Sequence, residues 1–176
     1  MTTYDYLTAA ETMRRRELVY GMVREPPAPI YGHQSVVTGL TTELSQHARR
    51  HRLGRVCVSP IDVVLNESRG LIVQPDVIFV SNERLAIIRK QVWGAPDLVV
   101  EVLSRGTRRY DRTTKLEWYR EYGVRECWIA DPRRQCIEVI AFTPTGVNRE
   151  TFESGGTLQS SVLTRLRLPI ADAFSW

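Results

Sequence analysis

Hydrophobic residues recur along this chain with two periods, one typical of helices and one typical of strands. The segment after Gly32 carries apolar residues at helical spacing, which predicts a long amphipathic helix over residues 33–52 that is closed by Gly54. The apolar positions that set this spacing are Val36, Val37, Leu40, Leu44 and Ala48. A second helix is expected over residues 108–122, with Gly123 as its natural stop.

Shorter elements complete the pattern. Short helical segments are expected over residues 4–14, 81–89 and 170–174. Apolar runs between turn residues predict strands over residues 17–23, 55–65 with a break at Pro60, 71–80, 97–103, 126–130, 135–142, 147–153 and 161–168. Residues 55–80 are expected to form a meander of two or three strands. Residues 131–134 predict the turn of an antiparallel hairpin.

The order of these elements indicates the fold class. A helix, a β-meander, a strand, a helix and a hairpin in succession favour a mixed central β-sheet flanked by helices, of the α/β or α+β class. A chain of 176 residues without a visible linker or repeat is long enough for one core. We therefore expect a single domain over residues 1–176.

Composition narrows the class of protein. No apolar run approaches the roughly 18 residues that a membrane span needs, and the first residues lack a signal-peptide core, so we expect a cytoplasmic protein without membrane contact. Cys57, Cys127 and Cys136 have no C-x-x-C spacing and are expected to be reduced core thiols. The net charge of +4 leans weakly towards polyanionic partners.

The basic residues are unevenly distributed between the two types. Of the 24 basic residues only Lys90 and Lys115 are lysines. Arginine is planar and permanently charged, whereas lysine carries a compact ammonium whose pKa responds to its surroundings. A lysine in such a chain indicates a position that arginine cannot fill, and the alternative interpretation is that the lysine is there by chance.

An acidic residue interrupts the most apolar strand. Glu101 lies in the run PDLVVEVLS of residues 96–104, which otherwise predicts a strand buried on both faces. Burying an ionised carboxylate there costs on the order of several kcal/mol unless a cation, a hydrogen-bond donor or a metal compensates its charge. The ordinary interpretation is a structural ion pair or a strand end in water. The sharper interpretation is a metal-binding or catalytic carboxylate.

A second acidic residue opens an earlier strand. Asp76 follows Gln74 and Pro75 at the start of an apolar run. If the two strands are neighbours, Asp76 and Glu101 can converge with Lys115 from the next helix. Two carboxylates suit a hard divalent cation such as Mg²⁺. A lysine beside that cation can orient or deprotonate the attacking water, or stabilise charge on phosphorus.

These motifs together resemble a known family. Pro75-Asp76, then DLVVEVLS (97–104), YDRTTK (110–115) and GVRECWIADP (123–132), are similar to the Uma-type restriction endonuclease family of the PD-(D/E)XK nuclease superfamily. The resemblance implies a restriction-endonuclease-like core, DNA as substrate, one or two Mg²⁺ or Mn²⁺ ions, and Asp76 and Glu101 as ligands. The superfamily's usual lysine would fall at Leu103, so the resemblance implies that Lys115 takes its role.

Four further residues are candidates for the same site, each with an ordinary alternative. Glu17 and His33 match family-like positions and either face the metal or lie in solvent. Asp97 is either another ligand or a cap of its strand. Asp111 stands four residues before Lys115, so a surface ion pair is favoured over catalysis, although the family match keeps it near the site.

Other features are weaker. His47 and His51 have a spacing that binds zinc, but no third ligand is evident, so a solvated helix face is favoured. The aromatic residues Trp118, Tyr119 and Tyr122 are expected to pack rather than to stack on bases. Arginines suited to phosphate contacts, with solvated charge as the default, are Arg49, Arg50, Arg52, Arg55, Arg105, Arg108, Arg109 and Arg112.

The sequence thus supports two functional hypotheses. The first is a metal-dependent DNA endonuclease that uses Asp76, Glu101 and Lys115. The second is a catalytically inactive module of the same fold that binds nucleic acid or a protein, which Leu103 favours slightly. Cutting both strands of a duplex suits a two-fold assembly, so a homodimer is an option that the sequence leaves open.

Overall fold

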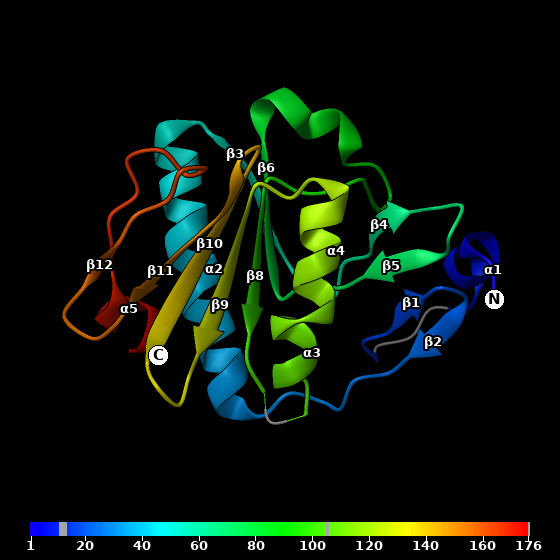
Figure 1. Cartoon of the computed structure of the whole chain (residues 1–176), viewed down its shortest axis with the longest axis horizontal. Coiled ribbons are helices and arrows are strands. Elements are labelled where there is room, and N and C mark those ends of the chain that lie inside the picture. The colour runs from blue at the N-terminus through cyan, green and yellow to red at the C-terminus, as the bar shows by residue number, and fades with distance from the viewer. Residues whose placement is uncertain (11–13, 105, 176) are drawn as a thin grey trace.

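The computed structural model describes residues 1–10, 14–104 and 106–175, and a six-stranded mixed sheet lies at its centre (Figure 1). The strand order is β11-β10-β9-β8-β6-β3, with β8 and β9 parallel and the other neighbours antiparallel. The strands are β3 (Gly54–Val58), β6 (Val77–Ser81), β8 (Leu98–Val102), β9 (Glu126–Asp131), β10 (Cys136–Thr143) and β11 (Gly146–Phe152). The expectation of a mixed central sheet is confirmed.

Helices cover both faces of this sheet (Figure 1). On one face lie α2 (Tyr31–His51) and α5 (Ile170–Phe174), and on the other α3 (Arg108–Arg112) and α4 (Thr114–Tyr122). The side chains of β8 point alternately to the two faces of the sheet, and because both faces are covered, both sets are buried. Val100 packs into the core under α2, whereas Val99 packs into the core under α4.

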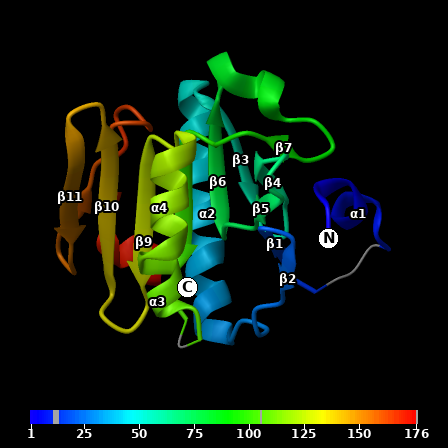
Figure 2. The ribbon, with the colours of Figure 1, turned by 45° about the vertical axis from the view of Figure 1, so that its right-hand side comes forward.

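A second sheet of five strands stands beside the first (Figure 2). Its order is β2-β1-β5-β4-β7, formed by β1 (Glu17–Val19), β2 (Met22–Arg24), β4 (Val63–Asn66), β5 (Leu71–Val73) and β7 (Val92–Trp93). Val63 and Val73 of this sheet share one apolar core with Ile78 and Val99 of the larger sheet. The helix α1 (Thr3–Thr8) packs Tyr6 against the outer face of the small sheet.

The strand predicted over residues 17–23 is instead a hairpin. Strands β1 and β2 pair antiparallel, with Val19 opposite Met22. Tyr20 and Gly21 between them both have positive φ, 50° and 87°. Two successive positive φ angles are those of a tight type I′ hairpin turn, so the glycine reverses the chain rather than interrupting one strand.

The strand predicted over residues 71–80 is divided between the two sheets. Strand β5 ends at Val73 in the small sheet, and β6 begins at Val77 in the large one. Pro75, which has no N–H to donate to a ladder, lies in the break. The expected meander over residues 55–80 is therefore wrong, because its strands belong to different sheets.

The helix predicted over residues 108–122 is broken at Thr113. The backbone there has φ −124° and ψ −80°, which separates α3 from α4. The Thr113 hydroxyl donates to the carbonyl of Arg109 at 2.7 Å, the kind of local bond with which threonine competes with helical bonding. Gly123 ends α4 with φ 93°, as predicted.

The remaining predictions have mixed outcomes. The helices at 33–52 and 170–174 are confirmed, and 81–89 holds the 3₁₀ helix η1 (Asn82–Ile87). The segment 161–168 is not a strand and carries only the first residue of β13 (Leu168–Pro169), which pairs with β12 (Thr157–Leu158). The N-terminal helix ends at Thr8, and residues 11–13 of its predicted span lie outside the described residues.

Two expectations from composition can be compared with the fold. Cys127 and Cys136 are free and buried as expected, whereas Cys57 is exposed on the edge strand β3, so it is not a core thiol. Among the described residues, no helix is both long and apolar enough to cross a membrane.

Candidate active site

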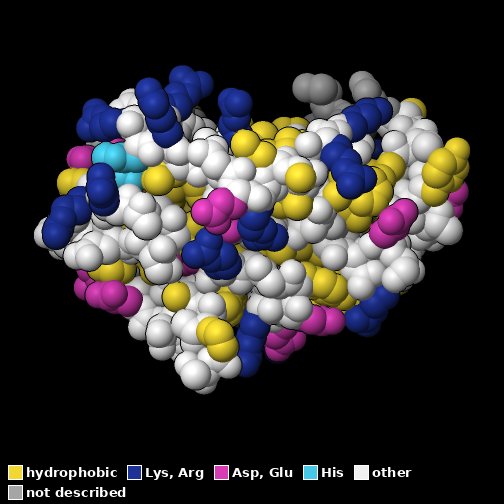
Figure 3. Space-filling view, turned by 90° about the horizontal axis from the view of Figure 1, so that it is seen from above, with side chains coloured by type: hydrophobic (Ala, Val, Ile, Leu, Met, Phe, Trp, Pro, Cys, Tyr) yellow, Lys and Arg dark blue, Asp and Glu magenta, His cyan; other side chains and the backbone are white. Residues whose placement is uncertain are grey.

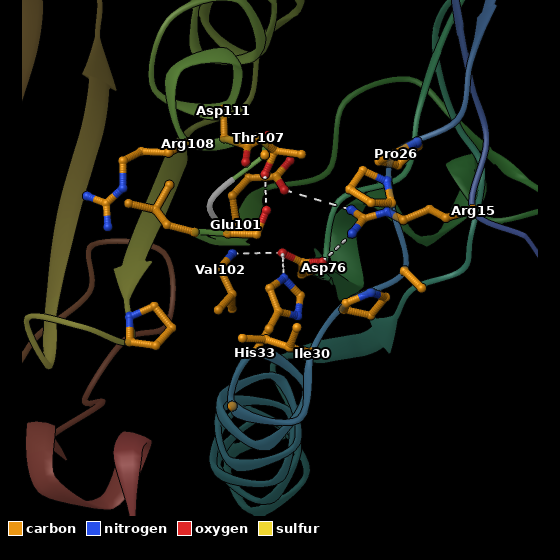
Figure 4. Close-up of a pocket in the computed structure, with 18 of the residues that line it drawn as sticks. Arg15, Pro26, Ile30, His33, Asp76, Glu101, Val102, Thr107, Arg108 and Asp111 are labelled. Carbon is orange, nitrogen blue, oxygen red and sulfur yellow. Dashed lines mark hydrogen bonds and ion pairs between the residues drawn. The ribbon is translucent and has the colours of Figure 1, made fainter.

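The two predicted carboxylates meet across neighbouring strands. Strands β6 and β8 pair antiparallel with Val77 opposite Val100, so the register extended by one residue sets Asp76 opposite Glu101. Asp76 is 3% exposed and Glu101 is 1% exposed. Both lie at the carboxyl end of β8, next to the beginning of α2 (Figure 4). The convergence that the sequence left conditional on strand pairing is therefore present.

Lys115 reaches the same place from the first turn of α4. Its ammonium Nζ lies 3.0 Å from Glu101 Oε1, 2.7 Å from Glu17 Oε1 and 3.9 Å from Asp111 Oδ1. Lys115 is 2% exposed. Burial opposes its charge, but the three surrounding carboxylates outweigh burial and raise the pKa of Lys115. The compact ammonium of Lys115 is thus close to three carboxylates at once.

The positive charge near Glu101 does not offset the effect of burial on its pKa. Burial raises its pKa to about 7, Lys115 offsets this only in part, and the charges of Asp111 and Asp76 act in the same direction as burial. The hydroxyl of Tyr119 donates to Glu101 Oε1, and burial holds the pKa of Tyr119 well above its usual value. Tyr119 packs in the core as expected, but its hydroxyl is also part of the site.

Asp76 is better compensated than Glu101. The backbone N–H of Val102 donates to Asp76 Oδ2 at 2.7 Å, and His33 Nε2 lies 3.4 Å from the same oxygen. Burial by itself would raise the pKa of Asp76, but the contact with His33 and the charge of Arg15 lower it. Burial likewise opposes protonation of His33, and its contact with Asp76 outweighs burial and raises its pKa.

Arg15 is a site residue that the sequence did not single out. Its Nη1 donates to Asp76 Oδ1 at 2.7 Å, and its Nη2 lies 3.9 Å from Glu101 Oε2 (Figure 4). The same Nη2 donates to the carbonyl of Gln74. Arg15 stands in a run of three arginines without periodicity, so no local pattern distinguished it from its neighbours.

The structure decides between the alternatives that the sequence left open for Glu17 and His33, and corrects the one favoured for Asp111. Glu17 and His33 are 1% and 5% exposed, so neither lies in solvent. Asp111 is 3% exposed, so its contact with Lys115 is a buried ion pair and not a surface pair. The strand β1 and the first turn of α2, both remote in sequence from Glu101, carry Glu17 and His33 to it.

Asp97 lies at the other end of β8, away from these residues. It accepts the backbone N–H of Ser81 at 2.8 Å and pairs with Arg84 at 3.3 Å and Arg125 at 3.2 Å. Asp97 is not among the residues that line the cavity at Glu101. Its contacts match the alternative of a cap on the strand.

A cavity of about 340 Å³ opens onto the carboxylates (Figure 4). The proline-rich segment 26–29 and residues 104 and 106–108 both line it. Asp76, Glu101, Asp111 and Lys115 line its interior. Among the described residues, the further arginines that line the cavity are Arg24, Arg108 and Arg133.

The arginines proposed for phosphate contacts fall into two groups. Arg108 lines the cavity and pairs with Asp131, and Arg109 and Arg112 belong to the same short helix. The other group is Arg49 and Arg50 at the end of α2, Arg52 just after it and Arg55 in β3. This end of the molecule is remote from the cavity, and Figure 3 shows basic side chains gathered around histidine there. Arg105 lies outside the described residues.

The histidine pair His47 and His51 lies at the same remote end. Their rings are 4.5 Å apart, and His47 Nε2 lies 2.9 Å from the carbonyl of Thr164. Over residues 1–10, 14–104 and 106–175, no group of three or more histidines, cysteines or carboxylates could hold a metal ion. The solvated helix face remains the better interpretation of this pair.

The carboxylate pair is nevertheless suited to one kind of metal. Mg²⁺ keeps several waters and is usually held by one or two carboxylates together with substrate phosphates, so it does not need a third protein ligand. Asp76 and Glu101 supply hard oxygen atoms at the floor of an open cavity. Burial raises the pKa of Glu101 and so disfavours its charged form, which a further cation beside it would stabilise.

Comparison with known proteins gives the family and the fold of this chain. A family model described as "Uma2: Putative restriction endonuclease" matches residues 2–171. The chain belongs to the Uma2 family. No functionally curated protein matches it. A solved structure, described as a putative nuclease belonging to DUF820 from Anabaena variabilis, superposes with a TM-score of 0.83 at 21% identity, over 100% of this chain and 98% of that one.

The structural likeness shows the fold of this Uma2 protein. Its mixed sheet flanked by helices is the restriction-endonuclease-like core that the sequence resemblance implied. Family membership associates the chain with nucleases.

Proposed function

We propose that this Uma2 protein is a divalent-metal-dependent nuclease that hydrolyses phosphodiester bonds in DNA. The proposal depends chiefly on one observation, the meeting of Asp76, Glu101 and Lys115 at the floor of a cavity. Buried carboxylates with perturbed pKa values in a cleft are typical of functional sites. The shared core of the two sheets supports treating the chain as one nuclease domain.

In this proposal Asp76 and Glu101 hold Mg²⁺ or Mn²⁺, as one ion or two. Bound there, the metal supplies charge neutralisation at the scissile phosphate and a water of lowered pKa. The Val102 N–H and His33 keep Asp76 oriented towards the cavity, and the Tyr119 hydroxyl and Lys115 keep Glu101 oriented. Supporting contacts of this kind fix the geometry of a carboxylate pair before the substrate arrives.

Lys115 acts in this proposal as a fixed ammonium. It stands 2.7 Å from Glu17 and 3.0 Å from Glu101, a setting that keeps the proton on the nitrogen. Such a group orients the attacking water and stabilises negative charge that develops on the phosphate. Glu17 has the separate task of holding this ammonium, because a second N–H donor, from Gln74, fixes its carboxylate.

The surroundings of the cavity suit a nucleic acid. Arg108 and Arg133 at the cavity, with the exposed Arg109 nearby in α3, offer cations for phosphates on either side of the scissile bond. The net charge of +4 acts in the same direction. A homodimer that cuts both strands stays a prediction, which the oligomeric state in solution tests.

The experiment that tests the function is cleavage of plasmid and single-stranded DNA in Mg²⁺, Mn²⁺ or EDTA. We expect cleavage only with metal, and a loss of at least about 100-fold in Asp76→Asn and Glu101→Gln, since even residues that merely support a ligand cost 10–100-fold. The exposed Glu121→Gln is the matched control. Cleavage in EDTA, or cleavage retained by both variants, contradicts the proposal.

A second candidate is nucleic-acid binding without cleavage. Two observations favour it, the apolar Leu103 at the usual lysine position and the guanidinium of Arg15 beside both carboxylates. DNA binding by a folded protein that cleaves no substrate with either metal would select this second function.

A further inference from the structure

Arg15 lies where a metal ion between Asp76 and Glu101 would have to bind. Its Nη1 contacts Asp76 at 2.7 Å, and its Nη2 lies 3.9 Å from Glu101 (Figure 4). The side chain is 21% exposed, more than either carboxylate, and lines the same cavity as both of them. Guanidinium and metal ion therefore compete for the same carboxylate oxygen atoms.

The contacts of Arg15 are incomplete. The distance of 3.9 Å to Glu101 exceeds that of a hydrogen bond, and the buried Arg15 Nε has no hydrogen-bond partner. A buried donor without a partner costs free energy, which makes departure of this side chain easier. The arginine thus neutralises the pair only in part.

A second cavity beside Arg15 can accommodate its side chain. Arg15 and Asp76 also line this second cavity, of about 460 Å³, which the proline-rich segment lines too. Glu25, Gln34 and Ser59 line that cavity and offer oxygen acceptors for a guanidinium. The side chain can leave the carboxylates without being forced into an apolar space.

The charge balance favours an exchange of this kind. Among the described residues, four carboxylates, Glu17, Asp76, Glu101 and Asp111, face three permanent cations, Arg15, Arg24 and Lys115, and one titratable group, His33. A divalent ion in place of Arg15 brings one more positive charge to the same carboxylates. Burial strengthens each of these interactions relative to water.

We propose that Arg15 is a resident counter-ion of the Asp76–Glu101 pair, and that a divalent metal ion displaces it into the second cavity. The inference deepens the proposed function and depends on the metal site in it. Without metal, Arg15 stabilises the buried Asp76. With metal, the two carboxylates are free to act as ligands, so Arg15 sets the metal concentration at which the site fills.

The test is calorimetric titration of Mn²⁺ into the whole protein, without DNA. We expect Arg15→Gln to bind Mn²⁺ about tenfold more tightly or better, the factor that corresponds to one hydrogen bond between charged groups. Arg108→Gln is the matched control. It removes the same charge from the same cavity, but Arg108 pairs with Asp131 and contacts neither carboxylate.

The outcomes separate this inference from the proposed function. Tighter binding by Arg15→Gln than by Arg108→Gln supports the exchange, also when the unaltered protein binds too weakly to measure. Equal or weaker binding by Arg15→Gln, with measurable binding by the unaltered protein, overturns the exchange and leaves the metal site standing. If no variant binds Mn²⁺, the exchange and the metal site of the proposed function both fail.

A second variant covers the case in which Arg15→Gln does not fold. Arg15→Lys keeps one charge but cannot span two carboxylates, so we expect its Mn²⁺ affinity to exceed that of the unaltered protein. Thermal unfolding gives an independent readout. Each folded Arg15 variant is expected to melt below the unaltered protein in EDTA and to gain more in melting temperature from Mn²⁺. An unchanged gain overturns the exchange.

Discussion

Strand β8 carries a buried carboxylate at each end, and the two have opposite electrostatic environments. At one end Asp97 is fully buried, accepts an N–H from Ser81 and pairs with Arg84 and Arg125. Burial alone would raise the pKa of Asp97, but these donors and cations lower it. At the other end, burial raises the pKa of Glu101 to about 7.

The difference teaches that burial of a charge is not in itself a sign of function. Asp97 is 0% exposed and Glu101 is 1% exposed, so burial does not distinguish them. Compensation of the charge distinguishes them. Two arginines on the solvent side pair with Asp97, whereas Glu101 shares the single ammonium of Lys115 with Glu17 and Asp111. Glu101, whose pKa is raised and which lies at a cavity, is therefore the carboxylate that we propose as a metal ligand.

The largest effect is expected from removing the ammonium at the Glu101 end. Lys115→Met leaves Glu17 and Glu101 buried without their cation, and loss of one partner from a buried pair costs about 3–5 kcal/mol. The measurement is the free energy of unfolding in urea. The chain's other lysine supplies the control, since Lys90 is exposed and Lys90→Met should change stability by less than about 0.5 kcal/mol. Equal effects of the two substitutions would show that the buried pairs contribute nothing.

A smaller effect, with a characteristic pH dependence, is expected at the other end. Asp97→Asn is expected to lower stability at pH 7 by about 1–3 kcal/mol, since it weakens bonds to two cations and a backbone N–H. The pKa of Asp97 is lowered in the folded state, so its contribution is present above the unfolded value of 3.8 and is lost as pH falls through the folded value. The gap between the two proteins should therefore narrow below about pH 4.

Unfolding in urea from pH 7 to pH 3 measures this gap. Metal-dependent cleavage by Asp97→Asn, measured where the variant is folded, should match that of the unaltered protein. A gap that stays constant down to pH 3 would contradict the assignment of Asp97 as a compensated structural carboxylate. A loss of cleavage as large as that of Glu101→Gln would show that the two ends of β8 do not differ in function.

Much of this arrangement follows from patterns in the sequence. The run at 97–103 predicted a strand buried on both faces, and Val99 and Val100 do pack into different cores. The odd Glu101 within it pointed to compensation, which the structure supplies through Lys115 and Tyr119. The scarcity of lysine in this chain and the family resemblance both point to Lys115.

Other parts of the site could not be predicted from local patterns. Arg15 contacts Asp76 from 61 residues away, and its immediate surroundings have no periodicity that sets it apart from Arg14. Glu17 and His33 looked equally suited to solvent, because burial in a site depends on which strands become neighbours. The division of residues 71–80 between two sheets is a choice of tertiary packing that a continuous apolar run does not reveal.

The smallest effect sharpens the comparison at the level of one hydrogen bond. Tyr119→Phe removes a hydroxyl that donates to Glu101, and burial keeps that hydroxyl protonated. We expect stability to fall by about 1–2 kcal/mol, because a buried charged acceptor loses a donor. Tyr122→Phe, in the same helix, is the matched control, since the Tyr122 hydroxyl accepts long bonds of 3.3 and 3.4 Å from Arg69 and Asn66. If both substitutions cost the same in urea unfolding, the hydroxyl of Tyr119 does not compensate Glu101, and the contrast with the well-compensated Asp97 becomes larger still.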